Sequence, residues 1–232
     1  MNRRERWVNS CVHAVWARMQ RAGEIVPGTR AAEAFGSLGE GSSIGFPAAT
    51  VMGARSIHIG ARTLVGRQVT LSVGYGPDDA RLPERGLVIG DRCVVGARTS
   101  LTAHSSIVIG DDVWFGQDVF VSDASHGYQE LGVPIGLQLG EHQPVTVGSG
   151  SWVGHGAIIL PGSTIGRNVV VAAGSVVRGT VEDNAVVGGS PIRVLRRFEP
   201  GVGWLSAAGD LRPVLPAFLP PKVQVGGPHP RG

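Results

Sequence analysis

The sequence predicts a mainly β protein in which short parallel strands wind into a stacked coil, and three regularities support this fold class. A bulky apolar residue, here called the leader, returns every six residues; a small or compact residue stands four places after every leader but Leu71; and glycine follows many leaders directly. The leaders are Ile59, Val65, Leu71, Ile89, Val95, Leu101, Ile109, Phe115, Val121, Val147, Val153, Ile159, Ile165, Val171 and Val177. Residues i and i+4 of a strand face the same way, whereas a helix would use spacings of three and four. The leader and the small residue therefore both face the interior.

Each six-residue unit, or hexad, predicts one strand followed by one corner. Glycine after the leader suits a corner whose backbone either enters positive φ or leaves no room for a Cβ atom. The first two corners of a group tend to carry glycine, and the third carries Ser72, Thr102, Ser122, Leu160 or Arg178. Three hexads thus close a triangular turn of about 18 residues, and successive turns stack as parallel strands. The alternative, a sandwich of short strands, would not keep a six-residue phase over so long a stretch.

Residues 1–27 form an N-terminal segment with an amphipathic helix predicted over residues 3–21, which Gly23 and Pro27 end. Its apolar residues, at helical spacing, are Trp7, Val8, Cys11, Val12, Val15, Trp16 and Met19. We expect this stripe to pack on the coil or on a neighbouring subunit. The alternative is a helix that lies on a membrane surface, with its five arginines against anionic lipid and its two tryptophans in the interface.

The coil itself is assigned to residues 28–197, with excursions at 77–88 and 127–146 that break the six-residue phase. Residues 51–60 parallel residues 101–110, each as a third hexad extended by two residues. Residues 198–232 form a Pro/Gly-rich C-terminal extension, which holds seven of the fifteen prolines beyond Glu199, together with Trp204 and Phe218. Such a segment is expected to form no regular helix or central strand. Its apolar residues suggest that it lies partly against the body, and disorder is the alternative.

Composition bounds the function classes. The 232 residues carry a net charge of +3, and their 36 glycines show no period of three, which excludes a collagen-like fibre. No arginine-rich run with interleaved aromatic residues points to nucleic acid. Two cysteines, Cys11 and Cys93, exclude a disulfide framework and favour a reducing, cytoplasmic location. No apolar run approaches the ~20 residues that cross a bilayer, and Asn9, Ser10 and His13 interrupt the apolar centre that a signal peptide would need.

His126 stands at the end of a hexad, immediately before the second excursion, in the string VSDASHGYQELGVPIG. Downstream follow VTVGSGSWVGHGAIILPGSTIGRNVVVAAGSVV and VVGGSPIRVLR. These stretches, within about residues 85–197, resemble the hexapeptide-repeat acyltransferases related to maltose, galactoside and colanic-acid O-acetyltransferases. The resemblance implies a left-handed parallel β-helix, although the general rule for parallel crossovers would predict a right-handed turn. It also implies a homotrimer.

In that family a histidine just before the excursion is the catalytic base, so the resemblance implies this role for His126. An alcohol attacks a thioester carbonyl as its proton is removed, and an imidazole that titrates near neutral pH is suited to take that proton. Asp123 or Glu130 is close enough in sequence to orient the imidazole, and Asp123 is also a candidate for contacting the acceptor. Tyr128 supplies a hydrogen-bonding group on the excursion.

Three further histidines lie near this region of the sequence. His104 precedes His126 by one turn, at a position expected to face outward near the same groove, and His155 follows a corner glycine. We interpret both as surface residues rather than catalytic ones, and His104 is also a candidate for orienting the base or binding the acceptor. His142 has no supporting motif, but it stands on the second excursion, where it is available to an acceptor.

The acyl donor implied by the resemblance is acetyl-CoA or another acyl-CoA. In the family its thin arm lies along the coil surface between two subunits and bonds to backbone groups. The matching positions here are Trp152, Ala173, Gly174 and Ser175. The phosphates of its head group call for cationic side chains at the closing end of the coil, and the candidates are Arg178, Arg193 and Arg196.

We therefore expect an O-acetyltransferase that acts on a hydroxyl of a sugar or oligosaccharide. Three alternatives stay open: N-acetyl transfer to an amino sugar, a non-catalytic coil that binds ligands, and the zinc site of the gamma-class carbonic anhydrases, which share the left-handed coil. A zinc site of that kind needs two histidines close in sequence and a third from a neighbour. His104, His126 and His155 are too far apart to supply the pair, so no metal is expected.

Overall fold

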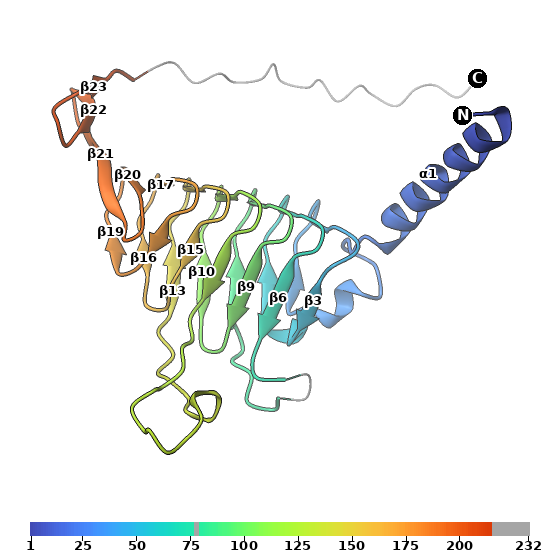
Figure 1. The fold of residues 1–232 in the computed structure, drawn as a ribbon, viewed down its shortest axis with the longest axis horizontal. Coiled ribbons are helices and arrows are strands. Elements are labelled where there is room, and N and C mark those ends of the chain that lie inside the picture. Colours follow the sequence, from blue (N-terminus) through green and yellow to red (C-terminus); the bar gives the residue numbers. More distant parts are fainter. Residues whose placement is uncertain (77–78, 215–232) are drawn as a thin grey trace.

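The computed structural model describes residues 1–76 and 79–214 as a triangular prism of stacked coils, with a helix leaving one end and a small antiparallel sheet at the other (Figure 1). Three sheets of parallel strands form the faces of the prism. The first face contains β1 (Ser37–Leu38), β4 (Ile57–Ile59), β7 (Leu87–Ile89), β10 (Ile107–Ile109), β13 (Val145–Val147), β16 (Thr164–Ile165) and β19 (Thr180–Val181). The second contains β2 (Ser43–Ile44), β5 (Leu64–Val65), β8 (Val94–Val95), β11 (Trp114–Phe115), β14 (Trp152–Val153), β17 (Val170–Val171) and β20 (Ala185–Gly188). The third contains β3 (Thr50–Met52), β6 (Thr70–Val73), β9 (Ser100–Ala103), β12 (Phe120–Ser122), β15 (Ile158–Ile159) and β18 (Val176–Val177).

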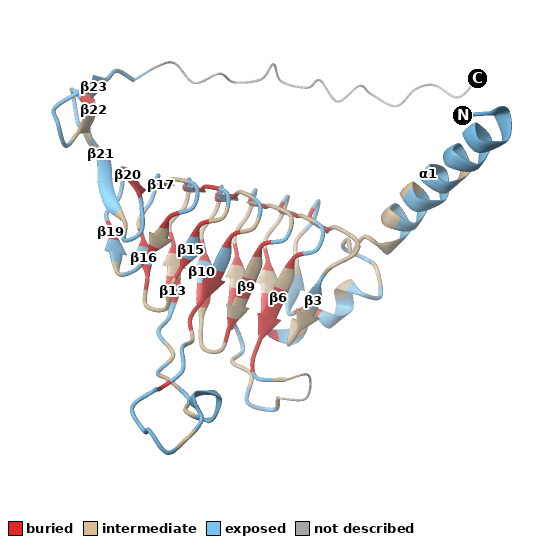
Figure 2. Ribbon diagram, in the orientation of Figure 1, coloured by how far each residue is buried: buried red, intermediate tan, exposed pale blue. Residues whose placement is uncertain are grey.

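The six-residue phase sets the register between coils. On the third face, Leu101 pairs with Leu71 on one side and with Val121 on the other, and Val121 pairs in turn with Ile159. All fifteen leaders are buried, as Figure 2 shows for the inner sides of the strands. The small residues that face inward are buried with them, among them Cys93 and Ser163. The predicted inward pair is confirmed for most hexads, and it forms one continuous core along the axis of the prism, whereas Ser105 is half-buried and Ser125 is exposed at the edge that carries the excursions.

Glycine is needed at these corners because the neighbouring coil leaves no room for a side chain. Glycines directly after the leaders, such as Gly96, do not have positive φ. A Cβ atom on Gly96 would overlap the carbonyl oxygen of Gly116 in the next coil. Positive φ occurs two residues later instead, where the chain uses Arg62, Gln68, Arg92, Arg98, Asp112, Asp118, Asn168 and Asn184 as well as glycine. Of the two explanations that the sequence left open, the close approach of stacked backbones is the right one.

The winding of the coil is left-handed, as the resemblance implied and against the general preference for right-handed crossovers. Both excursions leave the prism at the edge between the third and first faces, and they project from it side by side (Figure 1). The first is the connection between β6 and β7, residues 74–86 rather than the predicted 77–88, so Tyr75 belongs to it, and the second joins β12 to β13. Short 3-10 helices lie at Ala32–Ala34, Ala54–Ser56 and Ile135–Leu137, the last of them on the second excursion.

Helix α1 (Arg3–Gly23) confirms the predicted helix, but the predicted packing of this helix on the coil is not observed. Asn2 and Glu5 form a capping box at its start, and the helix ends at Gly23. It projects from the N-terminal end of the prism with no buried residue (Figures 1 and 2), and Trp7 is 69% exposed. The expectation that its apolar stripe packs on the coil is wrong within a single chain, because the helix axis points away from all three faces. No helix in the described part of the chain is long and apolar enough to cross a membrane.

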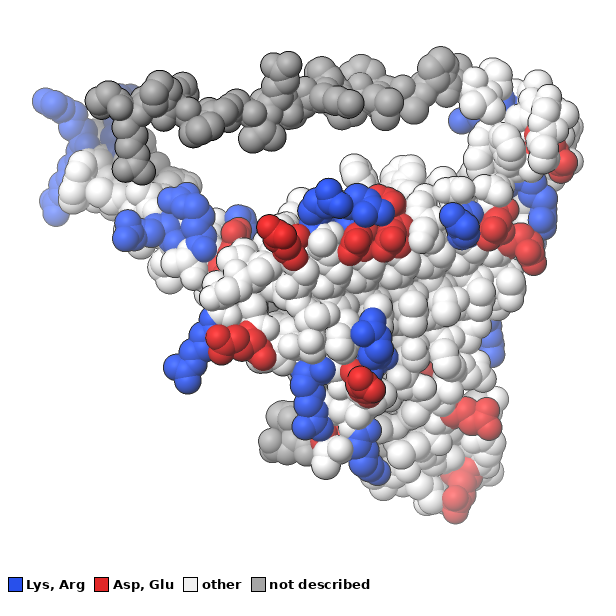
Figure 3. All heavy atoms as spheres, turned by 180° about the vertical axis from the view of Figure 1, so that it is seen from behind, with Lys and Arg blue, Asp and Glu red and all other residues white. Residues whose placement is uncertain are grey.

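Charged side chains pair along the edges of the prism. Arg92 contacts Asp112 of the next coil at 2.7 Å and lies 3.7 Å from Asp91 and from Asp111. The hydrogen bond with Asp112 raises the pKa of Arg92, and the same bond lowers the pKa of Asp112. Figure 3 shows basic and acidic groups side by side along the coil, so this surface carries little net charge. Exposed pairs of this kind add little stability.

The expectation that the C-terminal extension forms no central strand is wrong. Strand β21 (Arg193–Glu199) pairs antiparallel with β20, and β22 (Gly203–Ser206) lies between β21 and β23 (Leu211–Arg212), so the second sheet continues beyond the prism. Trp204 packs against Phe198 of the same extension, with ring centroids 5.5 Å apart. Phe218 and the rest of the C-terminal extension after residue 214 lie outside the described residues, as do residues 77–78 of the first excursion.

Candidate active site

His126 lies at the edge between the third and first faces, where the chain leaves β12 and enters the second excursion. A short antiparallel neck fixes its backbone: His126 bridges Leu139, Gly127 N–H donates to Gln138 at 2.8 Å, and Gly140 N–H donates to Ser125 at 3.0 Å. The side chain is exposed. The coil thus holds the backbone of His126 firmly and leaves its imidazole available to a ligand.

A cavity of about 320 Å³ lies beside this imidazole. Its lining comes from the ends of three successive strands of the third face and from both excursions. The lining residues are Tyr75, His104, Ser122, Ala124, Ser125, His126, Gly136, Leu139 and His142. Three of the seven histidines of the chain therefore meet in one cavity.

The rings of Tyr75, His104 and His142 pack on one another inside this cavity. The His104 and His142 rings are stacked, with centroids 5.3 Å apart and planes inclined by 19°. Tyr75 meets His104 edge to face at 4.7 Å, and its hydroxyl forms a hydrogen bond with Nε2 of His142. This bond joins the first excursion to the second.

Asp123 does not orient His126. Its carboxylate is fully buried and accepts three backbone hydrogen bonds from the previous coil, from His104 at 2.8 Å and from Ser105 and Ser106 at 2.7 Å each. Asp123 follows the inward leader Val121 by two residues, so strand alternation turns its side chain to the interior. The carboxylate therefore shapes the corner that carries His104, and the expectation of a direct role beside His126 is wrong.

The interpretation of His104 as a surface residue is wrong, and the side chain lies instead in the lining of the cavity beside His126. Its side chain is only 19% exposed, and Nδ1 lies 3.6 Å from a carboxylate oxygen of Asp123. Burial lowers the pKa of His104, and the negative charge of Asp123 opposes this shift. The lowered pKa favours the neutral form of the His104 imidazole. Nδ1 of His104 and Nδ1 of His142 are both buried and make no hydrogen bond in the described structure.

The remaining candidates of the second excursion lie outside the cavity lining. Tyr128 is 72% exposed, and the backbone amide of Glu130 bonds to the side chain of Gln138 while its carboxylate stays at the surface. His155 lies on a different edge, between the second and third faces, where it is exposed and 3.6 Å from Asp118. The interpretation of His155 as a surface residue agrees with this position.

The residues matched to the acyl donor lie on different parts of the prism. Arg178 lines a hollow of about 250 Å³ together with Ser125, Gln143, Leu160 and Pro161, on the same edge as His126 and sharing Ser125 with its cavity. The other positions fall elsewhere. Trp152 is 55% exposed on the second face, and Ala173 and Gly174 are exposed at the edge between the second and third faces.

The hydroxyl of Ser175 is not free for a ligand, because the residue is buried. It donates to the carbonyl of Ala172 at 2.7 Å and accepts from the backbone of Gly189 at 3.2 Å. Arg193 is exposed on β21, and Arg196 donates to the carbonyl of Asp210 at 3.1 Å. A single chain thus brings only Arg178 close to the His126 cavity.

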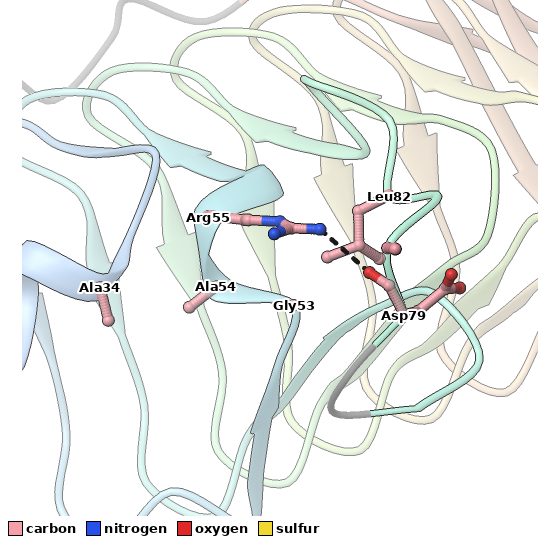
Figure 4. Close-up of a pocket in the computed structure, with 7 residues that line it drawn as sticks. Ala34, Gly53, Ala54, Arg55, Asp79 and Leu82 are labelled. Carbon is pink, nitrogen blue, oxygen red and sulfur yellow. Dashed lines mark hydrogen bonds between the residues drawn. The ribbon is translucent and has the colours of Figure 1, made fainter.

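A separate hollow of about 430 Å³ lies on the other side of the first excursion (Figure 4). It is lined by Ala34, Gly53, Ala54, Arg55, Asp79, Ala80 and Leu82, and Arg55 closes it by donating to the carbonyl of Asp79 at 3.0 Å. No histidine belongs to the described part of its lining. Within residues 1–76 and 79–214, no three or more His, Cys, Asp or Glu side chains are grouped to hold a metal ion.

Sequence reasoning missed Tyr75 and placed His142 near the acceptor only because it stands on the second excursion. Tyr75 stands four residues after Leu71 but is neither small nor buried, so the six-residue pattern predicts no role for either residue. The strand register does carry some information, because Val73 pairs with Ala103 and Ser122 pairs with Thr102. That alignment places Tyr75, His104 and His126 at the same edge, one above the other.

Two models of repeat families match the coil. Residues 144–179 match the bacterial transferase hexapeptide (six repeats), and residues 86–121 match the hexapeptide repeat of succinyl-transferase. Both matches fall on parts of the prism where the leaders are in register and buried.

Curated relatives match the middle of the chain. A putative lipopolysaccharide biosynthesis O-acetyl transferase of Escherichia coli is 30% identical over 122 residues, which cover 49% of this chain and 62% of that protein. A galactoside O-acetyltransferase of Lactococcus lactis is 35% identical over 99 residues, covering 43% of this chain and 47% of that protein. The chain therefore spans less than two thirds of the length of these relatives.

Solved structures share the fold. The N-acyltransferase AntD from Bacillus cereus, in complex with dTDP and coenzyme A, superposes with a TM-score of 0.59 at 20% identity. The superposition covers 72% of this chain and 86% of that one. At this level of identity the likeness describes the architecture of the coil.

Proposed function

We propose that this chain, which belongs to the hexapeptide-repeat transferases, is an acyl-CoA-dependent O-acyltransferase that acetylates a hydroxyl of a sugar. One observation carries the proposal. The exposed imidazole of His126 borders a cavity of about 320 Å³ that both excursions help to enclose. Relatives whose names specify O-acetyl transfer, including transfer to galactosides, support the reaction and the class of acceptor.

His126 acts in this proposal as the general base. The imidazole takes the proton of the acceptor hydroxyl as its oxygen attacks, and returns that proton to the leaving group. A well-placed base of this kind contributes about 10²–10⁴-fold to the rate. The antiparallel neck at Leu139 and Gly140 keeps the backbone of the base fixed through this step.

The acyl donor supplies an activated thioester carbonyl. The hollow beside Arg178 fits a narrow, partly apolar arm, because Leu160 and Pro161 give it apolar walls and the exposed guanidinium offers a charge for a phosphate. Trp152, Ala173 and Gly174 lie on other parts of the same chain, and they would complete the donor site from a neighbouring subunit. The proposal therefore includes a homotrimer with sites between chains.

The test is acyl transfer measured as thiol release from acetyl-CoA with a panel of sugars. We expect His126→Ala to lower kcat/KM for the best acceptor at least 100-fold, because the proton of the hydroxyl then has no base to accept it. His13→Ala, which removes an exposed imidazole from α1, is the matched control and should keep the activity of the wild type. Transfer by His126→Ala within threefold of wild type would refute the mechanism.

A further inference from the structure

The three stacked rings of the His126 cavity have no role in the chemistry proposed above. Tyr75 comes from the first excursion, His104 from the end of β9 and His142 from the second excursion, yet all three line one cavity with the base. Their faces and edges give that cavity an aromatic wall. Aromatic faces are suited to the apolar C–H side of a sugar ring, and the polar edges of the same rings are suited to its hydroxyls.

Among residues 1–76 and 79–214, no Lys, Arg, Asp or Glu belongs to the lining of the cavity. The carboxylate of Asp123 is fully buried and bound by three backbone amides. The carboxylate of Asp79 accepts from the backbone amides of Tyr75 and Arg81 and pairs with the guanidinium of Arg81 at 3.5 Å. A cationic acceptor would lose its hydration without gaining an opposite charge.

Two polar atoms of this wall are buried. Nδ1 of His104 lies 3.6 Å from the carboxylate of Asp123, and Nδ1 of His142 makes no hydrogen bond with the described residues. The lining also carries the hydroxyl groups of Ser122, Ser125 and Tyr75, which are suited to bind the hydroxyls of a sugar.

We propose that Tyr75, His104 and His142 form the acceptor-binding wall of this site. The acceptor is a neutral sugar ring rather than an amino sugar. The hydrogen bond between Tyr75 and His142, which joins the two excursions, determines which acceptors bind. The inference rests on the proposed function where it concerns acyl transfer, whereas the binding of the acceptor is measured independently of that reaction. In this role Tyr75 and His142 are specificity-determining residues.

The experiment compares Tyr75→Phe and His142→Gln with the wild type, using methyl β-galactoside, glucosamine and glucuronate as acceptors. We expect the wild type to prefer the galactoside to glucosamine at least tenfold in kcat/KM. In each variant KM for the galactoside should rise at least tenfold, while kcat changes less than threefold and KM for acetyl-CoA stays constant. His13→Gln removes an exposed imidazole from α1, far from the cavity in sequence, and should behave as the wild type.

Binding of methyl β-galactoside in the presence of coenzyme A, followed by isothermal titration calorimetry, keeps this test separate from the reaction. The Kd should rise at least tenfold in Tyr75→Phe and in His142→Gln, whether or not the wild type transfers an acyl group. Variants that bind the galactoside within twofold of wild type, or a wild type that prefers glucosamine, would overturn the inference. If His126→Ala loses acyl transfer but Tyr75→Phe binds the galactoside as the wild type does, the proposed reaction is supported and the acceptor-binding wall is refuted.

Discussion

The absence of a side chain at the corner glycines allows adjacent coils to pack closely. Gly96 lies so close to Gly116 of the next coil that a Cβ atom would overlap its carbonyl oxygen, whereas Gly156 has φ of +66° and open space around it. The two glycines serve different ends, since one makes room and the other supplies a left-handed backbone. Elsewhere Asn168 adopts the second conformation with φ of 52°, so that position does not depend on glycine.

We expect Gly96→Ala to lower the free energy of unfolding by about 2–4 kcal/mol, because the stacked backbones must move apart. Gly156→Asn should change it by less than about 1 kcal/mol, since asparagine tolerates the left-handed region. Urea unfolding followed by circular dichroism measures both. Equal losses in the two variants would contradict the assignment of different roles.

At this scale the sequence predicted His126 as the residue before the excursion, and the alternation rule could have predicted that Asp123 faces inward. It could not predict the partners of Asp123, because the three backbone amides that it binds belong to the previous coil. The same holds for Tyr75 and His142, whose contact joins two segments 67 residues apart. Side chains on excursions meet through tertiary structure, and no local period records that meeting.

Among the elements, α1 differs most from its surroundings. The strands follow directly from the hexads, and their bounds match the leaders because each leader must face the core. The helix also follows from its periodicity, but its packing does not, since an apolar stripe does not name the surface that covers it. Strands β22 and β23 escaped prediction for a related reason, as they depend on antiparallel pairing with β21 and carry no repeat.

Removal of residues 1–22 should leave the coil intact, because α1 buries none of its residues in the chain. We expect the melting temperature of the strands to change by less than about 3 °C, with loss of the helical signal in circular dichroism. A decrease of more than about 10 °C would show that the apolar face packs on a neighbouring subunit. Light scattering on both proteins then reports whether the number of subunits changes.

For the whole molecule, the parts of the proposed site occupy different faces of one prism. His126 and Arg178 lie on the edge between the third and first faces, and Trp152 lies on the second face. Two chains packed side by side would bring such surfaces together, as closed cyclic oligomers do. The repeat predicted the prism itself, but the arrangement of prisms depends on exposed residues that carry no period.

Mixed oligomers test this arrangement. His126→Ala and Trp152→Ala should each have little activity alone, since the first lacks the base and the second lacks part of the donor surface. Co-expressed in equal amounts, they should recover about a quarter of the wild-type activity, because random assembly leaves that share of interfaces intact. Light scattering should give three times the 24.1 kDa of one chain. No recovery in a mixture of proven composition would show that each chain holds a complete site.

The two excursions leave and rejoin the prism without disturbing its ladder. Gly86 donates to Ser56, Ile107 donates to Gly86, and Val145 donates to Ser106, so hydrogen bonding between coils resumes directly where each excursion ends. We therefore expect that lengthening or shortening either loop leaves the stacked strands unchanged. In evolutionary terms, a lineage can acquire a new acceptor through insertions and deletions at this one edge while selection on folding acts on the rest of the chain.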